Sequence, residues 1–247
     1  MTGSSVSRVL MGVLIFQLGI GAFLVIGDMQ GNFRLPGFGP TAPQLTEPVR
    51  PGDQRRQFAP NRQMPNLDPA RDPGELPPRL TLTETDTSGL WRLEGAISDG
   101  DAERIALQLA QAQTPVDTLI LQSPGGSVRD ALVLGRMLRA REIDTTILRG
   151  EYCFSACPYL FAGGQTRSAE DGAAIGVHQH YFGESTLLPA FVAVEDIQRG
   201  QGEVMVYLDE MGIDPMVMQH ALTTPSDEIY VLLPEELETY GFLSSAD

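Results

Sequence analysis

The sequence predicts an α/β domain with a largely parallel sheet, preceded by an apolar segment and a proline-rich linker. From residue 79 onward, short apolar runs of strand character alternate with segments whose apolar residues recur at helical spacing, a pattern typical of α/β domains. Ahead of that region lie a continuous apolar run at 9–27 and a segment rich in proline at 28–78. The length of 247 residues suits one medium-sized domain with such appendages.

The apolar run at 9–27 is uncharged and 19 residues long. A helix of that length covers roughly 30 Å of hydrocarbon, whereas a signal-peptide core is usually shorter, about 7–15 residues. The run therefore favours a retained membrane anchor, with cleavage near Gly27 and release of the remainder as the alternative. Arg8 precedes the run and favours a cytoplasmic N-terminus. We accordingly expect the domain on the periplasmic or other extracytoplasmic side.

The linker at 28–78 holds 11 of the 18 prolines and shows neither helical nor strand periodicity. Because such a segment buries too little apolar surface to fold alone, we expect a semi-extended, disordered tether. Residues 80–247 carry 26 acidic residues against 9 arginines, a net charge of −17. That charge repels nucleic acid and anionic lipid surfaces, so nucleic acid is not an expected partner. The acidity otherwise indicates solubility, or a bias toward basic or neutral substrates.

Local patterning predicts each element of the domain at 79–247. Alternating residues at 79–84 and 89–97, separated by a Thr-Ser-Gly turn, predict a β-hairpin. Further strands are expected at 117–122, 143–148, 173–178 and 228–232. Helices are expected from a cap at Ser98 or Asp99 to about 113, at 128–141, 155–162, 191–211 and 234–240, and after Asp214-Pro215. A loop over the cleft is expected at 181–189.

Ser155 is the candidate nucleophile, because it lies where strand is expected to give way to helix. The first amides of a helix are unpaired and positive, so the Ala156 N–H could stabilise an oxyanion formed at a carbonyl attacked by Ser155. Gly125 and Gly126 could supply a second donor, since a backbone without Cβ approaches substrate closely. Taken separately, Ser155 also fits a helix N-cap and Pro-Gly-Gly an ordinary turn. The turn lacks the pattern of a phosphate loop.

The chain contains no lysine, which excludes a Ser–Lys dyad and leaves histidine as the base for a nucleophilic serine. His178 closes an apolar strand, and its imidazole titrates near neutral pH, as a general base requires. Asp227 lies in a turn just before the last strand and could orient His178, although a loop aspartate is usually only solvated. His180 is the second choice as base, and His220 fits a packing role.

Four motifs in this order resemble those of the Clp protease proteolytic subunit (ClpP) and its relatives on the crotonase-type fold. They are Ser-Pro-Gly-Gly-Ser-Val at 123–128, the Ser155 elbow followed by Leu-Phe-Ala-Gly-Gly at 160–164, Val-His-Gln at 177–179, and the segment at 226–243 that begins Ser-Asp-Glu. The resemblance covers about residues 90–243. It implies a repeated β-β-α spiral, a homo-oligomer, and a serine endopeptidase with Ser155 as nucleophile, His178 as base and Asp227 as the orienting carboxylate.

The chain departs from the family pattern at the elbow, where Ser-Ala-Cys-Pro replaces the family's Ser-Met-Gly. Cys153 and Cys157 flank Ser155 at positions −2 and +2. In an oxidising compartment they could form a disulfide if their Cα atoms lie within about 4.4–6.8 Å; two buried thiols are the alternative. Neither cysteine matches the family's nucleophile position, and the pair has no supporting cluster of metal ligands. We therefore expect no metal and no cofactor.

The expected function is a membrane-tethered, ClpP-like serine peptidase that acts on peptides or proteins. Gly125 or Gly126, together with Ala156, would bind the oxyanion. Two other functions stay open: a non-catalytic scaffold with the same fold, and a crotonase-like enzyme that acts on an acyl thioester. The acidic domain offers few basic groups for a nucleotide phosphate, which counts against the thioester. An ATPase partner is not expected outside the cytoplasm, where ATP is scarce.

Overall fold

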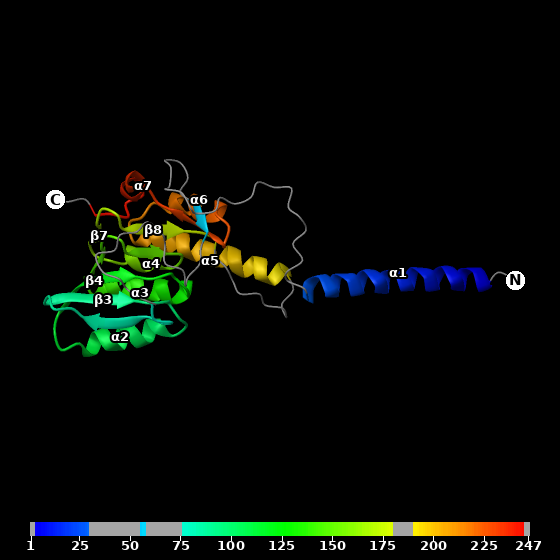
Figure 1. Ribbon diagram of the computed structural model, residues 1–247, viewed down its shortest axis with the longest axis horizontal. Coiled ribbons are helices and arrows are strands. Elements are labelled where there is room, and N and C mark those ends of the chain that lie inside the picture. The colour runs from blue at the N-terminus through cyan, green and yellow to red at the C-terminus, as the bar shows by residue number, and fades with distance from the viewer. Residues whose placement is uncertain (1–2, 30–54, 58–75, 180–189, 245–247) are drawn as a thin grey trace. The chain divides into compact units, whose positions relative to one another are not determined.

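The structure, a computed structural model, describes residues 3–29, 55–57, 76–179 and 190–244. The chain divides into two units, Met1–Pro43 and Gln44–Asp247. The second unit is a mixed α/β domain in which helices and strands alternate along the chain (Figure 1). The predicted fold class is thereby confirmed at the level of α/β.

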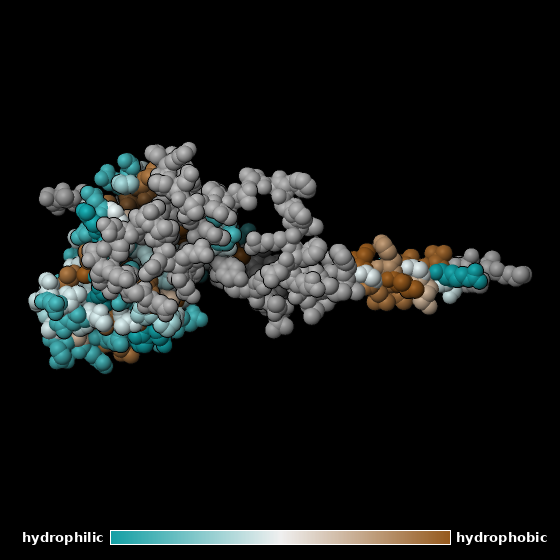
Figure 2. Space-filling model, in the orientation of Figure 1, coloured by the Kyte–Doolittle hydropathy of each residue, from teal (hydrophilic) through white to brown (hydrophobic). Residues whose placement is uncertain are grey.

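The first unit contains helix α1 (Gly3–Met29). Its described side chains, at 7–21, are exposed and mostly apolar, and they colour brown along most of their length in Figure 2. Among the residues that the structure describes, no helix combines the length and the apolar character that crossing a membrane requires. The membrane anchor at 9–27 stays a prediction.

Within the described residues, the larger sheet has five strands in the order β2-β3-β4-β5-β7. They are β2 (Thr81–Glu84), β3 (Gly89–Glu94), β4 (Val116–Gln122), β5 (Asp144–Ile147) and β7 (Arg167–Ala169). The hairpin of β2 and β3 is antiparallel, as predicted, and the pairs from β3 to β7 are parallel. Leu119 and Leu121 of β4 share one buried cluster with residues of α2 (Asp101–Gln111) and α3 (Val128–Ala140). These two helices therefore provide the apolar cover that β4 needs.

The smaller sheet has the strand order β1-β9-β8-β6. Its strands are β1 (Arg55–Gln57), β6 (Tyr152–Phe154), β8 (Ala174–Val177) and β9 (Glu228–Val231). β6 and β8 are parallel, whereas β9 runs antiparallel to both of its neighbours. A parallel bridge between Ser123 and Cys153 links the end of β4 to β6. The two sheets thus meet beside the Pro-Gly-Gly turn and the candidate nucleophile.

Five further helices complete the described part of the domain. They are α4 (Cys157–Ala162), α5 (Ala190–Glu210), the 3-10 helix η1 (Pro215–Val217), α6 (Met218–Thr223) and α7 (Pro234–Thr239). Every residue of α4 is buried. A Cβ added to Gly163 would lie 2.3 Å from the Cα of Gly135, so α3 and the end of α4 meet through glycines. The Tyr207 hydroxyl of α5 donates to the Tyr159 carbonyl at 2.7 Å. These contacts fix α4, the helix that follows the elbow.

Three strands and one helix start differ from the sequence predictions. β1, β6 and β7 are not predicted, because three residues are too few to establish an alternating pattern. β1 lies inside the segment expected to be a disordered tether, and it exists by pairing with the edge of β9. α2 begins after Gly100, whose φ is +80°, instead of at a side-chain cap on Ser98 or Asp99. The Asp101 carboxylate accepts a hydrogen bond from the Ser98 N–H.

Candidate active site

Ser155 lies between β6 and α4 with a φ of +61°. A positive φ is uncommon outside glycine and occurs preferentially at functional sites. Neighbouring strands hold this conformation: the Ser155 N–H donates to the Gly176 carbonyl at 2.9 Å, and the Phe154 N–H donates to the Ser123 carbonyl at 3.0 Å. The half-buried serine therefore stands on a tight elbow rather than at an ordinary helix cap.

A disulfide joins the two cysteines that flank this elbow. The Cα atoms of Cys153 and Cys157 are 5.1 Å apart, and both residues are fully buried. Of the two alternatives that the sequence leaves open, the structure has the disulfide and not a pair of thiols. The bond ties the end of β6 to the first residue of α4, so the chain on both sides of Ser155 is restrained.

His178 follows β8 and lies in hydrogen-bond contact with Ser155, Nε2 to Oγ at 2.7 Å. Its Nδ1 lies 2.9 Å from the main-chain carbonyl oxygen of Ser226. Because a carbonyl oxygen can only accept, Nδ1 carries the proton and Nε2 is left as the acceptor for the serine hydroxyl. The ring is thus held in the tautomer that a general base needs.

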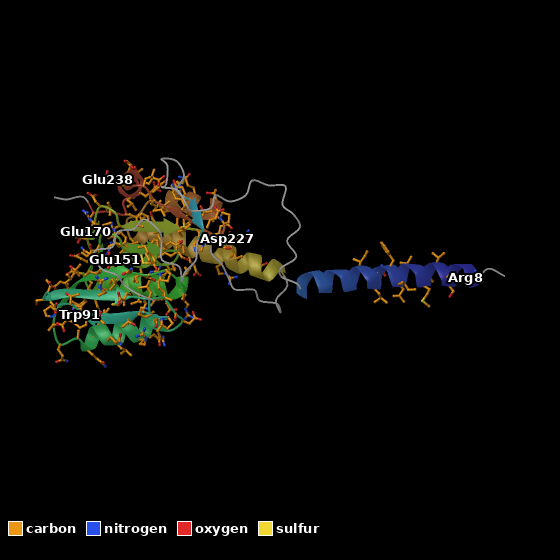
Figure 3. All side chains as sticks on the ribbon, viewed as in Figure 1. Arg8, Trp91, Glu151, Glu170, Asp227 and Glu238 are labelled. Carbon is orange, nitrogen blue, oxygen red and sulfur yellow. A yellow bond between two sulfur atoms is a disulfide. The ribbon has the colours of Figure 1, made fainter. Side chains whose placement is uncertain are left out.

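Asp227 lies exposed at the start of β9, where Figure 3 labels it. Within the described chain, the Ser226 carbonyl accepts the Nδ1–H hydrogen bond of His178 that the Asp227 carboxylate was expected to accept. Burial lowers the pKa of the His178 imidazole, while the bond to Ser226 and the charge of Asp227 raise it, and the net pKa is below its ordinary value. His178 is therefore neutral at pH 7 and able to accept a proton.

The glycine turn lies against the nucleophile. A Cβ added to Gly125 would fall 2.5 Å from the Cβ of Ser155 and 2.8 Å from the Ala156 nitrogen, so only glycine fits there. The Gly125 N–H donates to the Ser123 hydroxyl at 3.1 Å. Among the described residues, the N–H groups of Gly126 and Ala156 have no hydrogen-bond acceptor. Gly126 is also exposed, whereas Gly125 is buried. Of the two glycines predicted as alternatives, Gly126 is thus the better donor to an oxyanion.

The sequence does not show the roles of two contributors to the site, although both lie in motifs singled out above. Ser226 acts through its carbonyl, a group that every residue possesses, and only its place beside Asp227 could have suggested it. Ser123 belongs to the Ser-Pro-Gly-Gly motif, and its hydroxyl holds the turn by accepting the Gly125 N–H.

His220, the other histidine within the described residues, does not join this arrangement. His220 stacks on the Tyr230 ring with centroids 4.3 Å apart, and its Nε2 lies 2.8 Å from the Tyr240 hydroxyl, which fits the packing role predicted for it. His180 and the expected loop at 181–189 lie outside the described residues. Among the residues that can be assessed, no group of three or more His, Cys, Asp or Glu side chains could hold a metal ion.

A hydroxyl paired with a neutral imidazole, beside amides that have no hydrogen-bond acceptor, can perform acyl transfer. The hydroxyl is the attacking group, the imidazole accepts its proton, and the amides can stabilise the negative charge that develops on the attacked carbonyl. No model of a known protein family matches the chain, and no curated protein matches it. The geometry of the site is therefore the evidence for its chemistry.

Proposed function

We propose that this protein is a serine peptidase of ClpP-like type that cleaves peptide bonds with Ser155, His178 and a backbone oxyanion hole. The observation that carries the proposal is the 2.7 Å contact between Ser155 Oγ and His178 Nε2 at an elbow with positive φ. A serine and a histidine that only packed together would not require this backbone conformation, nor leave two amides without acceptors beside it.

The geometry supports a two-step reaction. Ser155 Oγ attacks the peptide carbonyl while its proton passes to His178 Nε2, and the N–H groups of Gly126 and Ala156 bind the resulting oxyanion. As the C–N bond breaks, His178 gives the proton to the leaving amine, and an acyl ester remains on Ser155. Water then attacks the ester with His178 again as base, which releases the acid and restores the serine.

Several observations support the remaining parts of the proposal. The run of parallel strands and helices from β3 to β7, joined at Ser123 to a second sheet, fits a ClpP- or crotonase-type spiral. The disulfide fits an extracytoplasmic location, because such bonds persist in oxidising compartments. Tethering through 9–27 and assembly into a homo-oligomer complete the proposal. An extended peptide pairing with a strand edge is the substrate form that suits a site at the sheet junction.

Labelling of the purified full-length protein with a fluorophosphonate probe tests the nucleophile. We expect labelling of the wild type, none of Ser155→Ala, and at least a hundredfold slower labelling of His178→Ala, because general-base catalysis contributes about 10²–10⁴-fold. Ser168→Ala is the matched control, since Ser168 is exposed on β7, at the edge of the sheet that does not contain β6.

The outcomes separate the competing functions. Equal labelling of the wild type and Ser155→Ala would remove the nucleophile assignment and favour a non-catalytic scaffold. If labelling depends on Ser155, digestion of a peptide library read by mass spectrometry identifies the cleaved bonds. Turnover of acyl thioesters without peptide cleavage would instead favour the crotonase-like alternative.

A further inference from the structure

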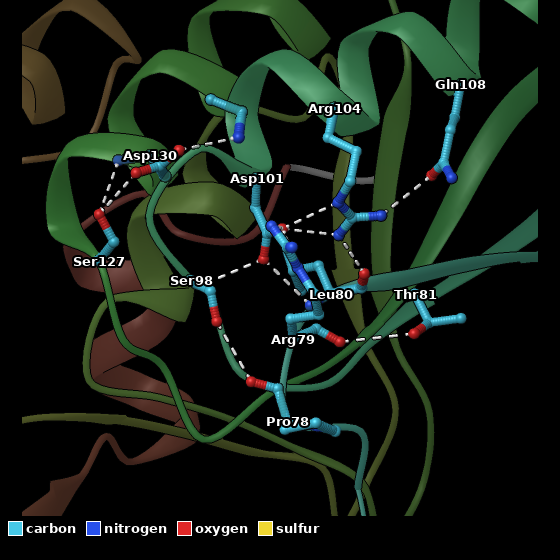
Figure 4. A network of polar contacts seen from close by, with 11 residues as sticks. Pro78, Arg79, Leu80, Thr81, Ser98, Asp101, Arg104, Gln108, Ser127 and Asp130 are labelled. Carbon is cyan, nitrogen blue, oxygen red and sulfur yellow. Dashed lines mark hydrogen bonds and ion pairs between the residues drawn. The ribbon is translucent and has the colours of Figure 1, made fainter.

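A single buried carboxylate connects the candidate oxyanion turn to the helix that precedes it. Asp130, in the first turn of α3, is 7 % exposed. Its Oδ2 accepts the Ser127 hydroxyl at 2.7 Å, and its Oδ1 accepts the Ala102 N–H of α2 at 2.8 Å (Figure 4). Both carboxylate oxygens are therefore engaged with groups of the protein, on two different helices.

The Ser127 end of this connection fixes the glycine turn. The Ser127 N–H donates to the Ile97 carbonyl at 2.7 Å, and the Ile97 N–H donates to the Gly125 carbonyl at 2.8 Å. No described peptide bond is cis, and in a planar trans peptide the N–H points opposite to the C=O. The Gly126 N–H thus points away from Ile97. The conformation held between Ile97 and Ser127 decides where this amide is directed.

The Ala102 end of the connection is itself firmly held. α2 has no side-chain cap of its own, because Gly100 occupies the N-cap position. Asp101, with no exposed surface, accepts hydrogen bonds from the Leu80 N–H at 3.1 Å and the Ser98 N–H at 2.9 Å, and it pairs with Arg79 and Arg104. Figure 4 shows Asp130 and Ser127 at one side of this network. Asp130 therefore links the glycine turn to a part of α2 that is itself held in place.

We propose that Asp130 is a positioning residue for the oxyanion hole: through the Ser127 hydroxyl it sets the direction of the Gly126 N–H. The inference rests on the proposed function. As the N-cap of α3, the Ser127 Oγ also accepts the Asp130 N–H at 3.3 Å. The bond from its hydroxyl to the carboxylate adds a second restraint on the Ser127 side chain, and charge-assisted bonds of this kind are about twice as strong as neutral ones.

Steady-state kinetics of peptide cleavage by the full-length protein test the role. In Asp130→Asn the Ser127 hydroxyl loses its charged acceptor while the shape of the side chain is kept. Loss of a whole oxyanion donor costs about 10²–10³-fold in kcat, and a misdirected donor should cost less. We expect kcat to fall about 10–100-fold with KM within about twofold of wild type. Affinity for a peptide boronic acid, which forms a tetrahedral adduct, should fall by the same factor as kcat.

Variants of Ser127 and Asp101 provide the controls. Ser127→Ala should match Asp130→Asn, Ser127→Thr should restore kcat by restoring the hydroxyl, and the double variant should be no slower than the slower single one. Asp101→Asn loosens the far end of the same network without touching Ser127, so it should lower the melting temperature and reduce kcat by a smaller factor than Asp130→Asn does. If Asp130→Asn does not fold, Ser127→Ala and Ser127→Thr test the inference by themselves.

Two results would overturn the inference: a fall in melting temperature with unchanged kcat in Asp130→Asn, or a rise in KM that accounts for the whole loss. A wild type that resists Ser155 labelling would instead remove the proposed function. Backbone hydrogen exchange then still tests the positioning, because weakening the Ser127 anchor should speed exchange of the Ile97 and Ser127 amides at least fivefold. Unchanged exchange would show that Asp130 does not hold the turn.

Discussion

At the scale of the residue, His178 is subject to opposing influences. Burial lowers the pKa of its imidazole, whereas the Ser226 carbonyl and the charge of Asp227 raise it. Because Asp227 is exposed, solvent and salt screen its charge. The carbonyl fixes the tautomer and the carboxylate adds electrostatic support, so two groups share the tasks that one aspartate performs in a Ser-His-Asp triad.

This division predicts the behaviour of Asp227→Asn. Without the carboxylate the pKa of His178 falls further, and the neutral, active base persists to lower pH. The acidic limb of the kcat/KM profile should therefore move to lower pH, by an amount that shrinks as salt is added. Replacing a triad aspartate that sets the tautomer costs roughly 10⁴-fold. Since Ser226 sets it here, we expect a loss of only about 10–100-fold on the plateau.

The pH profile of peptide cleavage, measured at low and high salt, checks this expectation. Asp171→Asn is the matched control, because it removes an exposed acid from the loop before β8. A loss near 10⁴-fold would mean that the carboxylate of Asp227 holds Nδ1 in solution. A limb that stays in place would mean that its charge does not influence the pKa of His178.

At the scale of the element, the elbow between β6 and α4 is restrained by hydrogen bonds to other segments and by its own disulfide. Main-chain bonds to Ser123 and Gly176 hold it from neighbouring strands. The disulfide between Cys153 and Cys157 closes a loop whose ends are 4 residues apart in sequence. A loop this short yields a stabilisation of ~2 kcal/mol in the chain-entropy description. The disulfide also helps to keep Ser155 in place, and labelling kinetics measure this second effect.

We expect Cys153→Ala/Cys157→Ala to lose ~2 kcal/mol of unfolding free energy and to label more slowly with fluorophosphonate. The slower labelling follows because the positive φ of Ser155 is no longer enforced at both flanks. Denaturant unfolding and labelling rates measure the two effects. Dithiothreitol should reproduce both losses in the wild type and change nothing in the double variant. Full labelling of the double variant would show that the strand contacts suffice.

The elements differ in how far the sequence could predict them. β4 and α3 have enough residues to display their periods, and both were predicted within one or two residues at each end. β6 and β1 have three residues each, and they form because a neighbouring strand offers unpaired backbone. The start of α2 was misplaced for a related reason: the acceptor for its Ala102 N–H comes from Asp130, 28 positions later.

The same distinction applies to the site. Ser155, His178 and the glycine pair could be identified because their residue types and spacing carry chemical meaning. The Ser226 carbonyl and the Asp130 carboxylate could not be identified in this way. Every residue has a main-chain carbonyl, so the residue type does not mark it, and a helix aspartate is usually a solvated or capping residue. Positioning groups of this kind become visible only when the fold brings distant segments together.

At the scale of the whole molecule, folding of the domain is linked to pH through Asp101. Burial raises the pKa of this carboxyl, but hydrogen bonds from Ser98, Arg104, Arg79 and Leu80 lower it, and the net pKa is below its ordinary value. A carboxyl whose pKa is lower in the folded state stabilises the fold above its unfolded-state pKa. That stability is lost as pH falls toward the pKa of the folded state.

Asp101→Asn should therefore be less stable than wild type at pH 7, by ~3 kcal/mol as for other buried, charge-bonded groups. The difference should begin to narrow below about pH 4, the ordinary range of an aspartate, because the carboxyl of the unfolded wild-type chain then takes up a proton. It should close only below the lower pKa of the folded state, where the folded wild-type carboxyl is protonated too. Denaturant unfolding from pH 2.5 to 7 measures the difference, with the exposed Asp209→Asn as control. A difference that stays constant across this range would mean that the residue acts through packing and not through its charge. Convergence at low pH would make one ionised carboxylate at the start of α2 a condition for the stability of the domain.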